Sequence, residues 1–205
     1  LVAGVACGDA LPEQWGAPSR PLDFFDVKGD VERLLALRGG GQTAEFEPAS
    51  LAWLHPGASA IIKLQDVTLG WCGAVHPAVL KALDIRKAVF GFELDLEPLL
   101  ARQVPFAKDI SRFPSVRRDL ALVLPNDVSY DRVRSCVAES AGRLLEKVVV
   151  FDVYQGGNLT KGYKSLAIGL IFNDVSSTLR DEDVDSLIQA VVLALGQRLG
   201  AQLRG

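Results

Sequence analysis

The second half of the chain switches repeatedly between two hydrophobic periods, and this order limits the folds that it can adopt. The strand-like stretches are residues 118–124, 145–154 and 165–172, with a short last strand near Gln202, and the helix-like stretches are residues 130–141 and 181–199. The resulting order is β-α-β-β-α-β. This order predicts a split β-α-β arrangement, in which two helices pack on an antiparallel sheet.

The first half of the chain contains shorter and more mixed elements. Strand-like stretches occur at residues 1–7, 44–47, 60–64, 68–75 and 89–96, and helices are expected at residues 24–37 and after Pro77. These elements predict an antiparallel module, so the fold class of the whole chain is α+β. Residues 101–114 contain Pro105 and Pro114 and show no clear period. We therefore predict one domain over residues 1–105 and a ferredoxin-like domain over residues 106–205.

Charge differs between the two predicted domains. Residues 1–105 carry 9 basic and 13 acidic side chains, a net charge of −4, and residues 106–205 carry 13 and 12, a net charge of +1. Any contact with nucleic acid must therefore come from a local patch in the second half. No stretch approaches the ~20 apolar residues of a membrane span. The three widely spaced cysteines indicate a reduced, cytoplasmic setting. Because the chain begins inside an apolar run and contains no Met, we expect a piece of a longer protein.

A hairpin predicted around residues 151–172 gathers side chains suited to binding a nucleotide. Strand alternation predicts Phe151 and Val153 on one face and Asp152 and Tyr154 on the other, exposed face. Close to this exposed face we expect Lys161, Lys164 and Ser165. An exposed aromatic ring, an acceptor for base edges and nearby cations are the groups that hold an unstacked base. An ordinary surface tyrosine on an amphipathic strand accounts for the same pattern.

Several motifs along the whole chain carry a family resemblance. They are Asp23–Glu32, Leu54–Gly57, Gly70–Pro77, Arg112–Leu120, Phe151–Gly156 with Lys164–Ala167, and Thr178–Val184. In this order they resemble the C-terminal part of the beta subunit of bacterial phenylalanyl-tRNA synthetases. The resemblance implies that the first half is the end of a non-catalytic module with the antiparallel fold of class II synthetases. It implies that the second half is a ferredoxin-fold anticodon-binding domain.

The resemblance also assigns roles to individual residues. Tyr154 is expected to stack on an anticodon base, Asp152 to accept hydrogen bonds from a guanine edge, and Ser165 to contact a neighbouring base or sugar. No catalytic residue, metal ligand or cofactor is expected in this fragment. The complete enzyme is expected to use ATP and magnesium to attach phenylalanine to its tRNA. The implied partners are phenylalanine tRNA and the alpha subunit, in an (αβ)2 heterotetramer, with no membrane contact.

Six basic residues of the second half are candidates for contact with the RNA backbone. They are Arg112, Arg117, Arg118, Lys161, Lys164 and Arg180. Phosphate contacts of this kind position RNA without reading its sequence. The same residues also fit a solvated surface on which half of them pair with Asp119, Asp174 or Asp181. Two other functions stay open for a fold of this class, namely a small-molecule regulatory module and a purely structural assembly module without RNA contact.

Overall fold

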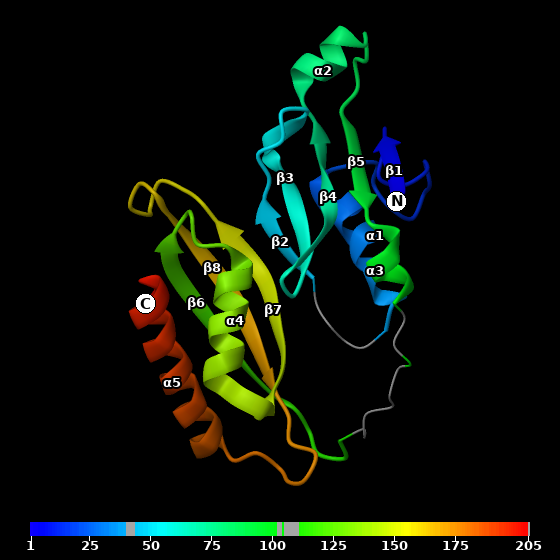
Figure 1. The fold of residues 1–205 in the computed structure, drawn as a ribbon. Coiled ribbons are helices and arrows are strands. Elements are labelled where there is room, and N and C mark those ends of the chain that lie inside the picture. The colour runs from blue at the N-terminus through cyan, green and yellow to red at the C-terminus, as the bar shows by residue number, and fades with distance from the viewer. Residues whose placement is uncertain (40–43, 102–103, 105–110, 205) are drawn as a thin grey trace. The chain divides into compact units, whose positions relative to one another are not determined.

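The computed structural model describes residues 1–39, 44–101, 104 and 111–204 (Figure 1). It divides into two compact units, residues 1–107 and residues 108–205. Each unit has its own antiparallel sheet and its own hydrophobic core. The boundary predicted between residues 105 and 106 lies outside the described residues. No helix in the described part of the chain is long and apolar enough to cross a membrane.

The first unit is built on a five-stranded sheet with the strand order β1-β5-β4-β3-β2. The strands are β1 (Val2–Cys7), β2 (Glu45–Pro48), β3 (Leu54–Leu64), β4 (Val67–Val75) and β5 (Val89–Leu94), and the helices are α1 (Phe24–Ala36), α2 (Pro77–Ala82) and α3 (Leu96–Leu100). All neighbouring strands pair antiparallel, as predicted. Strand β3 begins at Leu54, six residues before the predicted start at Ala60.

Helix α1 covers the first sheet, and its start is fixed by a capping box. The Asp23 carboxylate accepts hydrogen bonds from the first turn of the helix, and the Asp26 carboxylate accepts one from the Asp23 N–H. Hydrogen bonds from Arg20 also reach Asp26 and lower the pKa of its carboxyl to about 2. Val27 and Val31, about one turn apart on the helix, are buried in the core of this unit. The polar cap therefore sets where the helix begins, and the two valines determine which face of the helix packs against the core.

The second unit has the predicted β-α-β-β-α-β order. Its elements are β6 (Val116–Pro125), α4 (Tyr130–Ala141), a 3-10 turn at residues 142–144, β7 (Leu145–Tyr154), β8 (Tyr163–Phe172), α5 (Asp181–Leu199) and β9 (Gln202–Leu203). The strands pair antiparallel in the order β7-β8-β6-β9, so β8 and β6 are the two central strands. The predicted α+β class and ferredoxin-like arrangement are confirmed.

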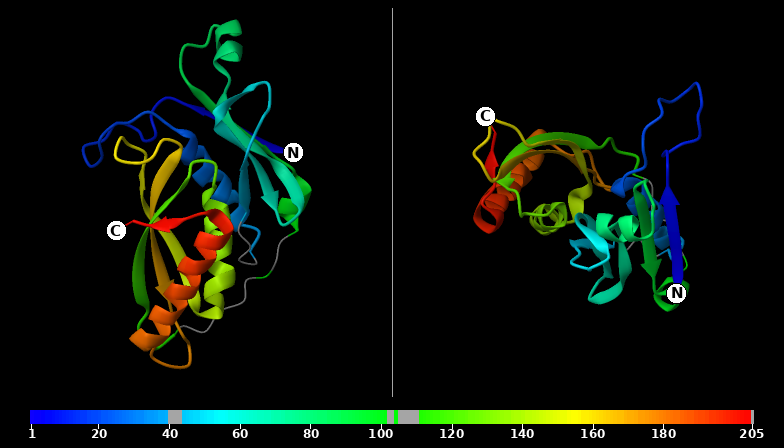
Figure 2. Two further views of the ribbon diagram at one scale, coloured as in Figure 1. Left: turned by 90° about the vertical axis from the view of Figure 1, so that its left-hand side faces the viewer. Right: turned by 90° about the horizontal axis from the view of Figure 1, so that it is seen from above.

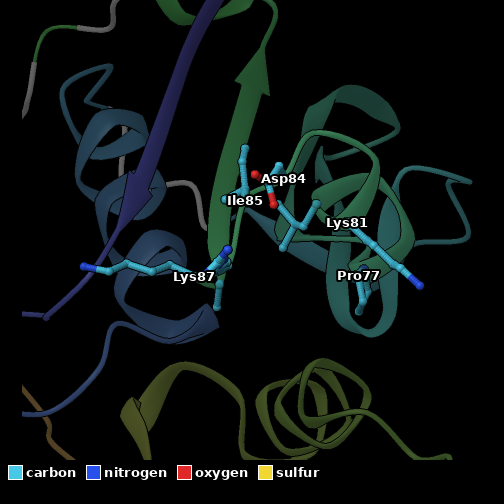
Figure 3. A pocket seen from close by; sticks show the side chains of 8 residues that line it. Pro77, Lys81, Asp84, Ile85 and Lys87 are labelled. Atoms are coloured by element: carbon cyan, nitrogen blue, oxygen red, sulfur yellow. The ribbon is translucent and has the colours of Figure 1, made fainter.

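Both long helices of the second unit lie on the same side of its sheet (Figure 2). The apolar side chains that face them are buried: Leu120, Leu122 and Leu124 on β6, and Leu166, Ile168, Leu170 and Phe172 on β8. The alternate positions face the other way, because successive residues of a strand point to opposite faces. We call this second surface the open face. On the central strands it comprises Arg117, Asp119, Ala121 and Val123 of β6 and Ser165, Ala167, Gly169 and Ile171 of β8.

Candidate nucleic-acid interface

The three residues expected to contact a base lie together on the open face. Tyr154 on β7 pairs directly with Ser165 on β8, and Asp152 pairs with Ala167. Directly paired residues of antiparallel strands project from the same face of the sheet. Ser165 and Ala167 belong to the open face, so Asp152 and Tyr154 project from it as well. The fold therefore brings together an aromatic ring, a carboxylate and a hydroxyl group.

A β-bulge in β7 changes the predicted position of Phe151. Val150 pairs with Ile168, which faces the helices, and the register then shifts before Asp152. The guanidinium carbon of Arg117, on the open face, lies 5.4 Å from the centre of the Phe151 ring. The ring therefore shares the open face with Asp152. The prediction that Phe151 and Val153 share a face was wrong, because the extra residue of a bulge interrupts strand alternation.

The ring of Tyr154 has close neighbours on two sides. A Cβ atom placed on Gly156 would lie 2.1 Å from Tyr154 Oη, so the loop after β7 passes too close to the phenol for a methyl group while the ring keeps this position. The guanidinium carbon of Arg204 lies 5.7 Å from the ring centre, within reach of a cation–π contact. The Arg204 N–H donates to the carbonyl oxygen of Ala121, which anchors this arginine beside β6. Even so, 37% of Tyr154 is exposed.

Ser165 is the least accessible of the three predicted contact residues. It is only 5% exposed and lies between Tyr154 on β7 and Val123 on β6. Tyr154 and Arg204 approach each other from opposite sides of these central strands. A direct contact between the Ser165 hydroxyl and RNA therefore stays a prediction, and it requires the neighbouring side chains to move.

The two neighbouring arginines of β6 point to opposite faces of the sheet. Arg117 lies on the open face, where its Nε donates a 2.7 Å hydrogen bond to Asp119 Oδ1. Arg118 faces α5 and donates a 2.6 Å hydrogen bond to Asp181 in the first turn of that helix. A second contact, of 3.5 Å, joins it to Asp185. These carboxylates raise the pKa of Arg118, and the ion pairs link β6 to α5.

Lys164 also faces the helix side of the sheet. Its Nζ donates hydrogen bonds to the carbonyl oxygens of Asn126, at 3.1 Å, and Val128, at 2.7 Å, and burial lowers the pKa of its ammonium group. The prediction that Lys164 lies beside the exposed face of Tyr154 was wrong, because β8 alternates and Lys164 precedes Ser165 by one residue. The other basic candidates, Arg112, Lys161 and Arg180, are exposed, and their contacts with phosphate stay predictions.

Comparison with known proteins accounts for both units. The family model described as "Phenylalanyl tRNA synthetase beta chain CLM domain" matches residues 1–96, and the one described as "Ferredoxin-fold anticodon binding domain" matches residues 111–204. The chain is 47% identical, over 203 residues, to a phenylalanine–tRNA ligase beta subunit of Xanthomonas axonopodis pv. citri. It is 45% identical, over 203 residues, to one of Xylella fastidiosa (strain Temecula1). Each alignment covers 99% of this chain and 25% of the relative.

The chain belongs to the phenylalanine–tRNA ligase beta-subunit family. It spans about a quarter of the length of the curated relatives that it matches. The expected family is thereby confirmed, and the second unit is a ferredoxin-fold anticodon-binding domain. This membership favours an RNA-binding role for the unit over a small-molecule regulatory module or a purely structural one.

Sequence reasoning missed two features of this anticodon-binding domain. Arg204 reaches Tyr154 because the short strand expected near Gln202, β9, pairs with β6, and a two-residue strand carries no signal of its pairing partner. Phe151 faces the same surface only because of the bulge. Among the described residues, no group of three or more His, Cys, Asp or Glu side chains is placed to hold a metal ion.

Proposed function

We propose that this chain is the C-terminal part of a phenylalanine–tRNA ligase beta subunit and that its second unit grips the anticodon of phenylalanine tRNA. The observation that carries the proposal is the shared position of Asp152 and Tyr154 on the open face of a unit that matches an anticodon-binding domain. A sheet surface with an exposed aromatic ring is a common way for proteins to hold unstacked RNA bases.

Each side chain has a distinct part in this proposal. The exposed ring of Tyr154 stacks on one anticodon base, which contributes ~1–3 kcal/mol to binding whatever the base. The Asp152 carboxylate accepts hydrogen bonds only, so it favours a guanine edge, which presents adjacent N–H donors. Ser165 contacts a neighbouring base or sugar once the side chains beside it move. Tyr154 thus supplies affinity, and Asp152 supplies discrimination between bases.

The exposed cations near the edges of the domain position the RNA. Arg112, Lys161 and Arg180 contact phosphates of the anticodon stem and loop in this proposal, and Arg204 adds positive charge beside Tyr154. Such contacts carry no sequence information, and they make binding weaken as salt increases. Arg118 and Lys164 contribute less, because their donors are bonded within the domain.

The complete enzyme places this chain in a larger assembly. We propose that the first unit is a non-catalytic scaffold that packs on the alpha subunit in a cytoplasmic (αβ)2 heterotetramer. The assembly charges phenylalanine tRNA with phenylalanine at the expense of ATP, with magnesium. In this proposal, ATP, magnesium and phenylalanine bind to parts of the assembly outside this chain. This chain contributes recognition and assembly but no catalytic residue.

The proposal is tested by truncating Tyr154. The 205-residue chain and its Tyr154→Ala variant are titrated with the anticodon stem-loop of phenylalanine tRNA, and binding is followed by fluorescence of the labelled RNA. We expect the variant to bind roughly 5- to 150-fold more weakly, since stacking on one base contributes ~1–3 kcal/mol. Trp15→Ala, which truncates a fully exposed aromatic residue of the first unit, is the control and should bind like the parent. Equal binding by parent and Tyr154→Ala would reject the assignment.

A further inference from the structure

A second aromatic position lies on the open face, outside the residues assigned to base binding above. Phe151 is 51% exposed, although it lies within strand β7 rather than in a loop. Its ring lies beside Arg117, whose guanidinium carbon is 5.4 Å from the ring centre, and the β-bulge brings Asp152 and Tyr154 onto the same face. Without the bulge, Phe151 and Asp152 would project from opposite faces, as successive residues of a regular strand do.

Neighbouring residues hold the Arg117 guanidinium in place on the sheet. Its Nε donates to Asp119 Oδ1 at 2.7 Å, and Gly169 of β8 lies beneath both side chains. A Cβ atom on Gly169 would come within 3.0 Å of Arg117 Nε and of Asp119 Oδ1, so a larger residue there would push the pair away from the sheet. The carboxylate neutralises the charge of Arg117. The Phe151 ring and the neutralised Arg117 guanidinium therefore present flat stacking surfaces rather than a site for phosphate.

The distance between the two aromatic positions suits a single strand of RNA. Phe151 and Tyr154 lie three residues apart on β7, about 10 Å at the usual rise of an extended strand and somewhat less across a bulge. Asp152 lies between them on the same face. Bases stack both on aromatic rings and on guanidinium planes, so each position offers a platform for one base.

We propose that Phe151 and Arg117 form a second base-binding position, which takes another unstacked base of the RNA strand bound at Tyr154. This inference rests on the proposed function, because it assumes that the open face binds the anticodon loop. The domain then holds two bases, one on Tyr154 and one on the Phe151–Arg117 pair. Because Asp119 neutralises Arg117, stacking at the second position depends little on salt.

The first test compares truncations at two exposed positions of β7 that face opposite sides of the sheet. Phe151→Ala should weaken binding of the anticodon stem-loop by about 5- to 150-fold, by a factor that hardly changes between low and high salt. Phe151→Leu keeps apolar bulk but lacks a flat ring, so it should also bind weakly. Val153 is 56% exposed and pairs with Leu166 on the other side of the sheet, so Val153→Ala should bind like the parent. Thermal unfolding of each variant confirms that it is folded.

The second test identifies which base occupies each position. The parent, Phe151→Ala and Tyr154→Ala chains are titrated with stem-loops in which one loop nucleotide at a time lacks its base. The penalty of Phe151→Ala should disappear with one such RNA, and the penalty of Tyr154→Ala with a different one. Unchanged binding by Phe151→Ala, or coupling of both residues to the same nucleotide, would overturn the second position and leave the role of Tyr154 intact. Absence of binding by the parent chain would overturn both proposals.

Discussion

A single methyl group at Gly156 should disable the Tyr154 platform without removing any chemical group from it. In Gly156→Ala, the new Cβ would lie 2.1 Å from Tyr154 Oη and 2.3 Å from Cζ, whereas ordinary contact begins at 3.4 Å. The phenol is the free end of a side chain and 37% of the residue is exposed, so the ring can swing into solvent instead of distorting the sheet. We expect the ring to leave the place where a base would stack.

The magnitudes follow from what the ring loses when it moves. Displacement removes the cation–π contact with Arg204, about 0.5–1 kcal/mol at an exposed site. Replacing glycine by alanine restricts the unfolded chain and so stabilises the folded state by about 0.4–1 kcal/mol, since Gly156 does not have a positive φ. The free energy of unfolding should therefore change by less than about 1 kcal/mol. RNA binding should weaken roughly 5- to 150-fold, as for Tyr154→Ala.

The assay is titration with the anticodon stem-loop, together with denaturant unfolding of the same samples. Gly157→Ala is the matched control, because a Cβ at that position meets nothing within 4 Å, and it should bind like the parent. In a Tyr154→Ala background, Gly156→Ala should have no further effect on affinity. The reasoning is refuted if Gly156→Ala binds RNA as tightly as the parent, or if it weakens binding further in that background.

Three other predictions concern the first unit. Gly70→Ala should lower the free energy of unfolding by about 2–6 kcal/mol in a denaturant titration, because φ is +156° and the new Cβ would lie 1.9 Å from the carbonyl oxygen of Glu93. Gly29→Ala, inside α1 with nothing near the new methyl group, should instead stabilise the unit by about 0.5–1 kcal/mol. Burial raises the pKa of the Cys72 thiol to about 11, so at about pH 8 it stays protonated and unreactive. Mass spectrometry after brief alkylation should find the exposed Cys7 modified and Cys72 unmodified until the unit unfolds.

The long elements of the second unit were predictable because their local signals agree with one another. Helix α4 spans the predicted residues 130–141 and helix α5 the predicted residues 181–199. Ser129 accepts a hydrogen bond at the start of α4, and Gly142 ends it with φ of 65°. Periodicity and capping thus point to the same boundaries. In the first unit, by contrast, β3 starts earlier than predicted, because its pairing with β4 is irregular between Leu54 and Ser59 and the apolar alternation begins only afterwards.

The candidate site was predictable only in part. Strand alternation predicts that Asp152 and Tyr154 share a face, and in the structure both project from the open face. The position of Phe151 depends on a bulge, which no residue type in β7 signals. The contact of Arg204 with Tyr154 joins residues 50 positions apart in the sequence through the short strand β9. Features that depend on one unpaired residue, or on a two-residue strand, leave no period in the sequence.

The most direct test of the central claim is whether the chain distinguishes one anticodon from another. The 205-residue chain is titrated with the phenylalanine anticodon stem-loop and with the same hairpin carrying a changed anticodon, at two salt concentrations. The account predicts salt-sensitive binding to the first hairpin and clearly weaker binding to the second, since the open face reads bases while the surrounding cations hold phosphates. Equal affinity for the two hairpins would contradict base recognition by Asp152 and Tyr154, and absence of binding at either salt concentration would contradict the RNA-binding role of the domain itself.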